Sequence, residues 1–229
     1  MRKLLAFVFG WCLIITTIIF SIHAIALRPE FYLSRYERMD LAQEIHTRDQ
    51  DLEASIHTLM DYLEDKTDSL QGTIVWKGRS QDMFNKRERE HMVDVKNLYQ
   101  NAMKVAYICG ALAIGILFYF INFYRKQALY DLSLGILQAG VCFAMCLIVL
   151  GFWIFIDFTS FWTWFHTLFF RNDLWLLNPQ TDFMICMLPE TIFSQLLISI
   201  VVMILCILIP IYLFCLYVHR KKGWYALCV

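Results

Sequence analysis

Charged residues are scarce in this chain, and several familiar catalytic motifs are missing from it. Asp, Glu, Lys and Arg make up 17% of the 229 residues, against about a quarter in typical soluble domains. Acidic and basic residues balance to a net charge of zero, which gives no indication of nucleic-acid binding. The sequence contains no H-E-x-x-H or cysteine–histidine zinc motif, no G-x-S-x-G elbow and no glycine-rich phosphate loop. We therefore expect no metal ion, no other cofactor and no activated serine nucleophile.

What is abundant instead is apolar sequence, at 59% of the residues. A helix that crosses a bilayer needs about 20 predominantly apolar residues, and four segments meet that length: residues 4–27, 105–123, 132–156 and 192–218. The first is too long for the apolar part of a signal peptide and is followed by no clear A-x-A cleavage site. The sequence therefore predicts an all-α integral membrane protein with four transmembrane helices.

Short basic flanks predict the orientation of these helices. Under the positive-inside rule, such flanks lie on the cytoplasmic side. The flanks are Arg2 and Lys3, Arg125 and Lys126, and the run Arg220, Lys221 and Lys222. Four spans place all three flanks on one side, so both termini are expected in the cytoplasm of a multi-pass cell-membrane protein. Residues 28–104 and 157–191 are then both extracellular.

Residues 28–104 form the only polar segment of domain-like size. The segment contains no cysteine, so no disulfide holds it together. A helix is expected over Ser34–Ile45, and a second helix, capped by Thr47, through about Leu63. The β-rich run Thr73–Gly78 ends in a turn signal and indicates a short strand or β-hairpin. We predict a small, mainly helical extracellular cap that rests on the membrane.

The end of the cap is marked by a helix start. Asn85 and Glu88 form the pattern of a capping box, in which each side chain bonds the other residue's backbone amide. The helix that begins there is expected to continue directly into the 105–123 span. Its first turns carry Glu88, His91 and Asp94 on one face, because they are three residues apart.

Residues 157–191 are crowded with aromatic side chains. The hydroxyl of Thr159 or Ser160 is expected to cap a helix through this run, which contains His166. The charges from Arg171 to Asp173 are too many for the hydrocarbon core. An extracellular segment buried partly in the membrane interface fits these residues better.

His91 and His166 are the candidate catalytic groups. Both lie on the predicted outer side, and general acid–base chemistry by histidine needs no nucleophile motif. Glu88 or Asp94 could orient the His91 imidazole. The ordinary readings are a solvated helix residue for His91 and an interfacial histidine in an aromatic belt for His166, and spacing alone does not decide between these readings and catalysis.

Two stretches of the sequence resemble the signatures of one family. FNKREREHMVDVKNL and FHTLFFRNDLWLLNPQTDFMICMLPE are similar to the two signatures of the bacterial lipoprotein intramolecular transacylases, called Lit, and occur in the same order. The residues that carry the resemblance are Phe84, Glu88, His91, Met92, Asp94, Val95 and Lys96, then His166, Phe169, Phe170, Asn172, Asp173, Trp175, Asp182 and Pro189.

The resemblance implies an acyltransferase. The family acts on diacylglyceryl-modified bacterial lipoproteins among membrane lipids. It moves the sn-2 acyl chain of the diacylglyceryl-cysteine to the α-amine of the same N-terminal cysteine, which gives the lyso form. It also implies His91 and His166 as the catalytic pair.

Other side chains are expected to bind or orient the substrate. Beside Glu88 and Asp94 these are the aromatic residues Trp162, Phe165, Phe169, Phe170 and Trp175 and the polar residues Arg171, Asn172 and Asp173. The main alternative is a non-catalytic membrane protein whose cap binds lipid or a partner protein. A further alternative is a haem protein that uses His91 and His166 as iron ligands.

Overall fold

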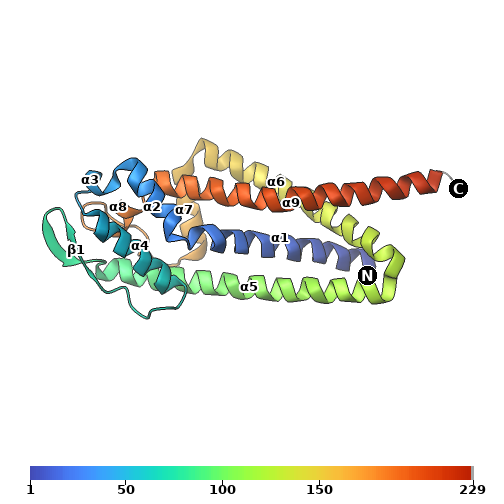
Figure 1. Ribbon diagram of the computed structural model, residues 1–229, viewed down its shortest axis with the longest axis horizontal. Coiled ribbons are helices and arrows are strands. Elements are labelled where there is room, and N and C mark those ends of the chain that lie inside the picture. The colour runs from blue at the N-terminus through green and yellow to red at the C-terminus, as the bar shows by residue number, and fades with distance from the viewer. Residues whose placement is uncertain (228–229) are drawn as a thin grey trace. The chain divides into compact units, whose positions relative to one another are not determined.

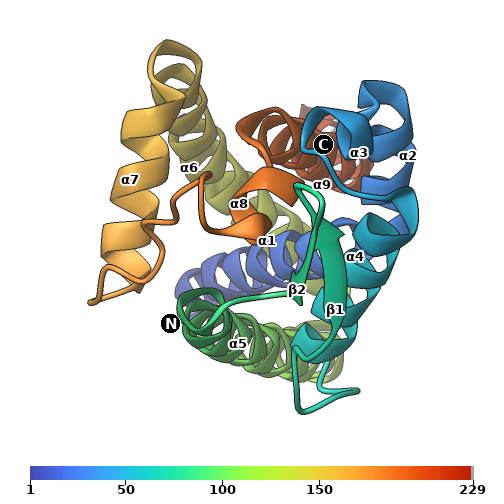
Figure 2. The ribbon, with the colours of Figure 1, turned by 90° about the vertical axis from the view of Figure 1, so that its left-hand side faces the viewer.

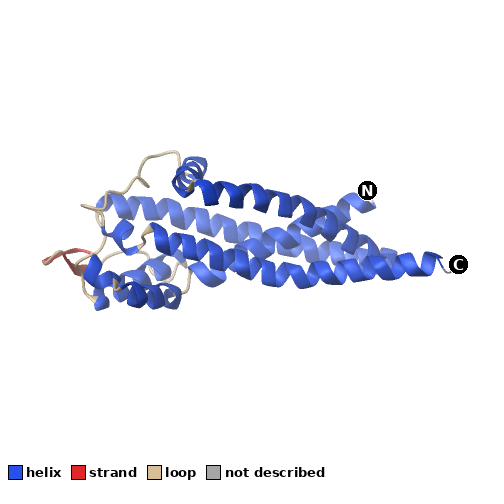
Figure 3. Cartoon of the chain, turned by 90° about the horizontal axis from the view of Figure 1, so that it is seen from above, coloured by secondary structure: helices blue, strands red, loops and turns tan. Residues whose placement is uncertain are grey.

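The computed structural model describes residues 1–227, except for the side chains of Lys126 and residues 222–227, so the predicted basic side chain of Lys222 lies outside the described residues. Among the residues that the structure describes, four helices are long and apolar enough to cross a membrane. The strands form a two-stranded antiparallel sheet, and the rest of the secondary structure is helical (Figure 3). The predicted fold class, an all-α integral membrane protein with a short β-hairpin, is confirmed.

The chain divides into two compact units. The first, here called the membrane unit, comprises Met1–Ser21, Met103–Trp162 and Val201–Val229, and the second, here called the polar unit, comprises Ile22–Ala102 and Thr163–Ile200. Several helices contribute residues to both.

The membrane unit contains all of α6 (Ala128–Ile156) and parts of α1 (Arg2–Ala26), α5 (Lys86–Tyr124) and α9 (Glu190–Leu227). These helices lie side by side in Figure 1. Their inward faces form one buried cluster that includes Ala6, Phe9, Ala113, Phe120, Leu132, Ile136 and Cys215. Their outward faces are also apolar: Phe155 is 88% exposed and Ile148 is 71% exposed. Faces of this kind are suited to contact with lipid chains, not water.

One end of the membrane unit gathers the predicted basic flanks. Arg2 forms an ion pair with Asp131 at 3.0 Å, which joins the amino end of α1 to the start of α6, just after the turn η1 (Arg125–Gln127). The rings of Tyr130 and His219 lie 4.2 Å apart, which brings the later part of α9 to the same end.

Two glycines allow α1 and α6 to approach each other closely. A Cβ atom on Gly10 would lie 2.7 Å from the carbonyl oxygen of Gly135 and 2.9 Å from the Cβ of Ala139. A Cβ atom on Gly135 would collide with the carbonyl group of Ala6. Small residues at a helix crossing permit this contact, as is common in membranes.

The polar unit has its own hydrophobic core. Its elements are α2 (Pro29–Met39), α3 (Leu41–Glu44), α4 (Asp49–Leu63), β1 (Thr73–Trp76), β2 (Arg79–Asp82), α8 (Phe183–Met187) and parts of α1, α5, α7 and α9. Fully buried side chains from α4, β1, the start of α5 and α8 form the centre, among them Ile56, Ile74, Phe84 and Met187. This core gives the cap a packed interior without a disulfide.

The structure corrects the predicted start of the cap. α2 begins at Pro29, at the first helical position that suits proline, and not at Ser34. It ends at Met39, and the left-handed backbone of Asp40 (φ 50°) separates α2 from α3. The predicted continuous helix over Ser34–Ile45 is therefore wrong.

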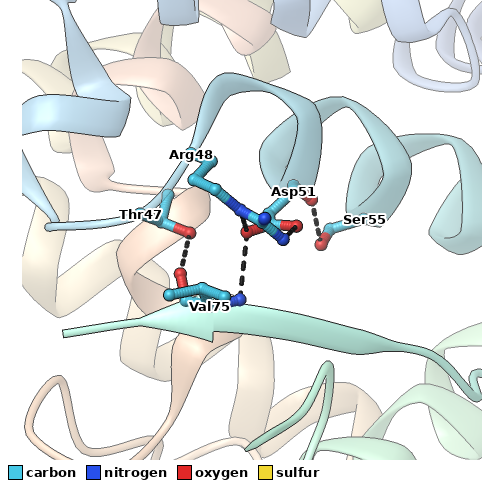
Figure 4. A network of polar contacts seen from close by, with 5 residues as sticks. All are labelled: Thr47, Arg48, Asp51, Ser55 and Val75. Carbon is cyan, nitrogen blue, oxygen red and sulfur yellow. Dashed lines mark hydrogen bonds and ion pairs between the residues drawn. The ribbon is translucent and has the colours of Figure 1, made fainter. Parts of the chain in front are cut away.

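Thr47 does not cap α4 as predicted. The residue before the helix is Arg48, which makes no capping bond, and the Thr47 hydroxyl instead donates to the Val75 carbonyl at 2.8 Å (Figure 4). The carboxylate of Asp51 accepts two bonds from Arg48, at 2.7 and 2.8 Å, and one from the Val75 amide at 3.0 Å. This polar network fastens β1 to the first turn of α4.

The hairpin itself was predicted and is present. Lys77 and Gly78 both have positive φ, 52° and 75°, as a two-residue type I′ turn requires. Trp76 is buried in the core and its indole donates to the carbonyl of Ile45 at 2.9 Å. Figure 2 shows β1 beside α4, with β2 on its other side.

Candidate active site

The first turn of α5 contains the predicted capping box. The Asn85 amide donates to Glu88 Oε2 at 2.7 Å, and the Glu88 amide donates to Asn85 Oδ1 at 3.1 Å, so the prediction is confirmed. The other oxygen of Glu88 accepts a bond from the Met184 amide at 2.5 Å. The Glu88 side chain is therefore occupied by the protein itself, and it joins α5 to α8.

This turn of α5 lies outside the membrane-crossing stretch. Charged side chains such as Lys86, Glu90 and Lys96 crowd the first half of the helix, whereas its second half is apolar enough to span a bilayer. Glu88 is 1% exposed, and burial raises the pKa of its carboxyl group to about 7, because desolvation disfavours the charged form.

A second carboxylate fixes the loop before α8. Asp182 accepts bonds from the Asn85 side chain at 2.8 Å, the Asn178 amide at 2.7 Å and the Thr181 hydroxyl at 2.9 Å. Asn85 thus serves both the capping box and this loop. The start of α5 is held against residues 178–187 from two directions.

The helix that carries His166 is α7 (Phe158–Phe169). Its first turn is capped by the Asp157 carboxylate, which accepts from the Ser160 amide at 2.9 Å. The predicted hydroxyl cap at Thr159 or Ser160 is therefore wrong. Asp157 performs the same task with a charge that the helix dipole favours at an N-terminus.

His91 and His166 lie close together inside the polar unit. His91 is 7% exposed and His166 is 5% exposed, and their ring centroids are 6.2 Å apart. The buried ring of Phe170 contacts both, at 5.3 and 5.7 Å. Trp175 stacks on His166 at 4.8 Å with an interplanar angle of 29°. Two titratable rings in one aromatic enclosure are an arrangement that can take up and release protons away from bulk water.

The surroundings of His91 favour its neutral form. Burial, and to a smaller degree the nearby His166, lower the pKa of His91 to about 4. Arg87 acts in the same direction, whereas Asp94 partly opposes it. Within the residues that the structure describes, His91 Nδ1 has no hydrogen-bond partner. The His91 imidazole is therefore in its neutral form near neutral pH, and its Nδ1 atom is free of any bond to the described protein groups.

Asn172 connects the His91 helix to the ring that stacks on His166. Its side-chain amide donates to the Asp94 carboxylate at 2.8 Å. Its backbone carbonyl accepts from the Trp175 indole at 3.0 Å, and its side-chain oxygen accepts from the Leu174 amide at 3.2 Å. Asn172 thus contacts both Asp94 on α5 and Trp175, the ring that stacks on His166.

Of the remaining predicted aromatic residues, two lie beside His166 and one lies in the membrane unit. Phe165 packs edge-on against His166 at 5.4 Å and against Phe169 at 4.9 Å, so these two extend the aromatic wall. Trp162 belongs to the membrane unit, where it stacks on Phe158 at 5.9 Å.

The polar residues after α7 also differ from one another. The guanidinium of Arg87 donates to the Asp173 carbonyl and lies 4.0 Å from the Asp173 carboxylate. Arg171 is exposed and forms no ion pair with another described residue. Arg87 was not predicted as a site residue, although it lies four residues before His91 and so on the same face of α5, which is a signal that could have identified it.

The described residues offer no group of three or more His, Cys, Asp or Glu side chains that could hold a metal ion. The residues brought together here are two imidazoles, the aromatic side chains around them and the polar groups that fix the surrounding loops.

Comparison with known proteins points to one family. Residues 7–193 match the model of the family "Lipoprotein intramolecular transacylase Lit". The solved structure of the membrane integral lipoprotein intramolecular transacylase Lit from Bacillus cereus is 22% identical, with a TM-score of 0.77 and 98% of each chain covered. A structure of the same enzyme with a histidine replaced by alanine is 21% identical, with a TM-score of 0.73, and the match covers 98% of this chain and 96% of that one. At such identities the likeness shows a shared fold. A comparison with curated proteins finds no match.

Proposed function

This chain belongs to the family of lipoprotein intramolecular transacylases, Lit, and on that premise we propose that His91 and His166 carry out the proton transfers of its reaction. The enzyme is an acyltransferase of the membrane, which sets aside the alternative of a non-catalytic membrane protein. The observation that carries the proposal is the convergence of the two buried rings, 6.2 Å apart, from α5 and α7.

The substrate is proposed to be the diacylglyceryl-cysteine at the amino terminus of a bacterial lipoprotein. Its α-amine attacks the carbonyl carbon of the sn-2 ester of the same molecule. The new C–N bond forms, the bond between the carbonyl carbon and the glycerol oxygen breaks, and one proton passes from nitrogen to that oxygen. The product is the N-acylated lyso form, and the reaction is an isomerisation that needs no enzyme nucleophile.

The two histidines divide the proton transfers between them. An α-amine has a pKa of about 7.7–8.0, but the nitrogen becomes far more acidic once it has attacked the carbonyl group. The neutral His91 ring can accept that proton even though its pKa is low. His166 returns a proton to the departing glycerol oxygen, a role supported by the 6.2 Å between its ring centroid and that of His91. General acid–base catalysis of this kind contributes about 10²–10⁴-fold.

The aromatic enclosure supports the same chemistry. Phe170 and Trp175 contact His166, and Phe165 and Phe169 continue the wall. Such a wall can hold acyl chains and keep water from the reacting groups. Because amine and ester belong to one flexible molecule, holding them together supplies much of the rate, with effective molarities of about 10⁵ M or more in well-oriented cases.

The proposed orientation places both termini in the cytoplasm and the polar unit outside the bacterial cell membrane. It is supported by the gathering of Arg2, the η1 turn and His219 at one end of the membrane unit. The positive-inside rule assigns that end to the cytoplasm. The lipoprotein substrates would then be reached in the outer leaflet.

The test is a conversion assay with a synthetic diacylglyceryl lipopeptide in membranes that contain the enzyme. Substrate and product have equal mass, so tandem mass spectrometry must locate the acyl chain on nitrogen or on glycerol. We expect His91→Ala and His166→Ala each to lower the conversion rate by about 10²-fold or more. His57→Ala, which removes an exposed histidine on α4, serves as the matched variant. Full conversion by both histidine variants would refute the assignment.

A further inference from the structure

The β1–β2 hairpin has two edges, and the protein uses only one of them. Along the outer edge of β1, the amide of Val75 donates to Asp51 at 3.0 Å and its carbonyl accepts from Thr47 at 2.8 Å. The Thr47–Trp76 bridge lies beside them. This edge is closed by side chains of the α4 start (Figure 4).

The register shows which backbone groups point outward from β2. In an antiparallel pair, hydrogen-bonded and non-bonded residue pairs alternate. The Met83 amide donates to the Gly72 carbonyl at 2.8 Å, so the 72–83, 74–81 and 76–79 pairs are the bonded ones in this register. Ser80 and Asp82 are therefore in non-bonded pairs, and their N–H and C=O groups face away from β1.

These outward groups are open. Every residue of β2 is exposed, and none of the backbone groups of Ser80 or Asp82 forms a hydrogen bond within the part of the chain that the structure describes. A cleft of about 480 Å³ lies at the open end of the hairpin, lined by Gln71, Gly72, Thr73, Asp82 and Arg89. Arg89 is held there by the Phe84 carbonyl at 2.6 Å and by Asp82 at 3.5 Å.

The hairpin is held in place by contacts with the rest of the polar unit. Its turn is fixed by Lys77, which donates to the carbonyl groups of Pro179 and Gln180 at 3.4 and 3.2 Å. Its inner face packs Ile74 and Trp76 into the core, and Trp76 meets Phe183 at 5.6 Å. A peptide that joined such an edge would meet a strand that is already ordered, which reduces the entropy cost of binding.

We propose that the free edge of β2 binds, in extended conformation, the polypeptide segment that follows the acylated cysteine of the lipoprotein substrate. The proposal rests on the proposed function, which makes the substrate a lipid joined to a peptide. Main-chain pairing with Ser80 and Asp82 supplies up to four hydrogen bonds and ignores side-chain identity. That property suits an enzyme whose substrates share a lipidated cysteine and differ in the residues after it.

The paired segment begins some residues after the cysteine. Arg89 and His91 are two positions apart on α5, so their side chains leave the helix about 200° apart. A substrate whose cysteine lies at His91 must therefore lead its peptide around the start of α5, a helix roughly 10 Å across, to reach the cleft beside Arg89. An extended chain covers about 3.3 Å per residue, so about four to six residues separate the cysteine from the first paired residue.

The experiment measures kcat/KM of the full-length enzyme in nanodiscs for two lipopeptides, one with about two residues and one with about ten residues after the diacylglyceryl-cysteine. We expect the longer lipopeptide to be favoured. N-methylation of single amides in the long peptide should lower kcat/KM by about 3- to 10-fold at alternate positions only, because every second amide faces β2. The proposal would be overturned if N-methylation left kcat/KM unchanged at every position, or lowered it equally at neighbouring positions.

An enzyme variant gives a second readout. Ser80→Pro removes an outward N–H without removing a rung of the hairpin, since proline is tolerated on edge strands. In Ser80→Pro, the ratio of kcat/KM for the long lipopeptide to kcat/KM for the short one should fall towards one. Gln81→Ala is the control, because the amide of residue 81 lies in the hairpin ladder, and it should keep the ratio of the unaltered enzyme. An unchanged preference in Ser80→Pro would contradict the proposal. Loss of the histidine mechanism would instead appear as full turnover of both lipopeptides by His91→Ala, so the two failures are distinguishable.

Discussion

Glu88 and His91 lie three residues apart on α5, both buried, with pKa values displaced in opposite directions. Burial lowers the pKa of His91 from 6.5 to about 4 and raises that of Glu88 from 4.5 to about 7. Between pH 4.5 and 6.5 the folded protein therefore keeps both side chains neutral, whereas the unfolded chain charges both. Each group makes the free energy of unfolding depend on pH, and the two dependences oppose each other.

The signs follow from the protons exchanged on unfolding. His91 takes up a proton when the protein unfolds, so its contribution to stability is present above pH 6.5 and is lost as the pH falls towards 4. Glu88 releases a proton, so its contribution is present below pH 4.5 and is lost as the pH rises through 7. In the shared window each slope is about 1.4 kcal/mol per pH unit, and together they cancel.

In the unaltered protein the two pH slopes of the free energy of unfolding cancel, so each should become measurable only when the other group is removed by substitution. We expect the stability of His91→Phe, relative to the unaltered protein, to fall by about 1.4 kcal/mol per pH unit as the pH rises from 4.5 to 6.5. The relative stability of Glu88→Gln should rise by a similar amount over the same range. The measurement is denaturant unfolding in one detergent at several pH values, with each variant compared with the unaltered protein so that other titrating groups drop out.

The double variant is the control, because it removes both slopes and should run parallel to the unaltered protein. The reasoning fails if the two single-variant differences have the same sign. It also fails if both are independent of pH, because burial would then not govern either group.

Two further predictions concern single side chains. Gly135→Val should force α1 away from α6, because its side chain would collide with the carbonyl of Ala6, and should lower stability by about 1–3 kcal/mol, read as a lower melting temperature in detergent. Asn172→Ala removes the 2.8 Å bond to Asp94 and frees the loop that holds Trp175, so kcat should fall by up to about 10²-fold. An unaltered KM would separate this positioning effect from loss of binding.

Features fixed within one helical turn were predictable from the sequence. The Asn85–Glu88 capping box needs only a spacing of three residues, and the structure contains both of its bonds. Each of the four apolar spans and the Lys77–Gly78 hairpin turn is likewise formed by one continuous stretch of sequence. Their energies depend on neighbours in the chain, so no knowledge of tertiary packing is required.

Features decided by distant partners were not predictable. Thr47 has the side chain of a good helix cap, but its hydroxyl gains the Val75 carbonyl, 28 residues away, as a partner. Glu88 was expected to orient substrate or imidazole, yet the Met184 amide, 96 residues away, occupies its second oxygen. In both cases a backbone group from a distant segment of the chain needed a partner, and that demand cannot be read from the local spacing of residues.

Contacts with distant residues also give Trp175 a role that its residue type alone did not indicate. From sequence it was one more surface for lipid chains. Its ring stacks on His166 while its N–H is held by the Asn172 carbonyl, and Asn172 is held by Asp94 on the His91 helix. The two histidines lie 75 positions apart in the sequence, so their relative placement depends on contacts between the two segments that carry them. Two hydrogen bonds and one ring stack can fix that placement without putting a further charge in the enclosure, where a charge would shift the protonation of both imidazoles.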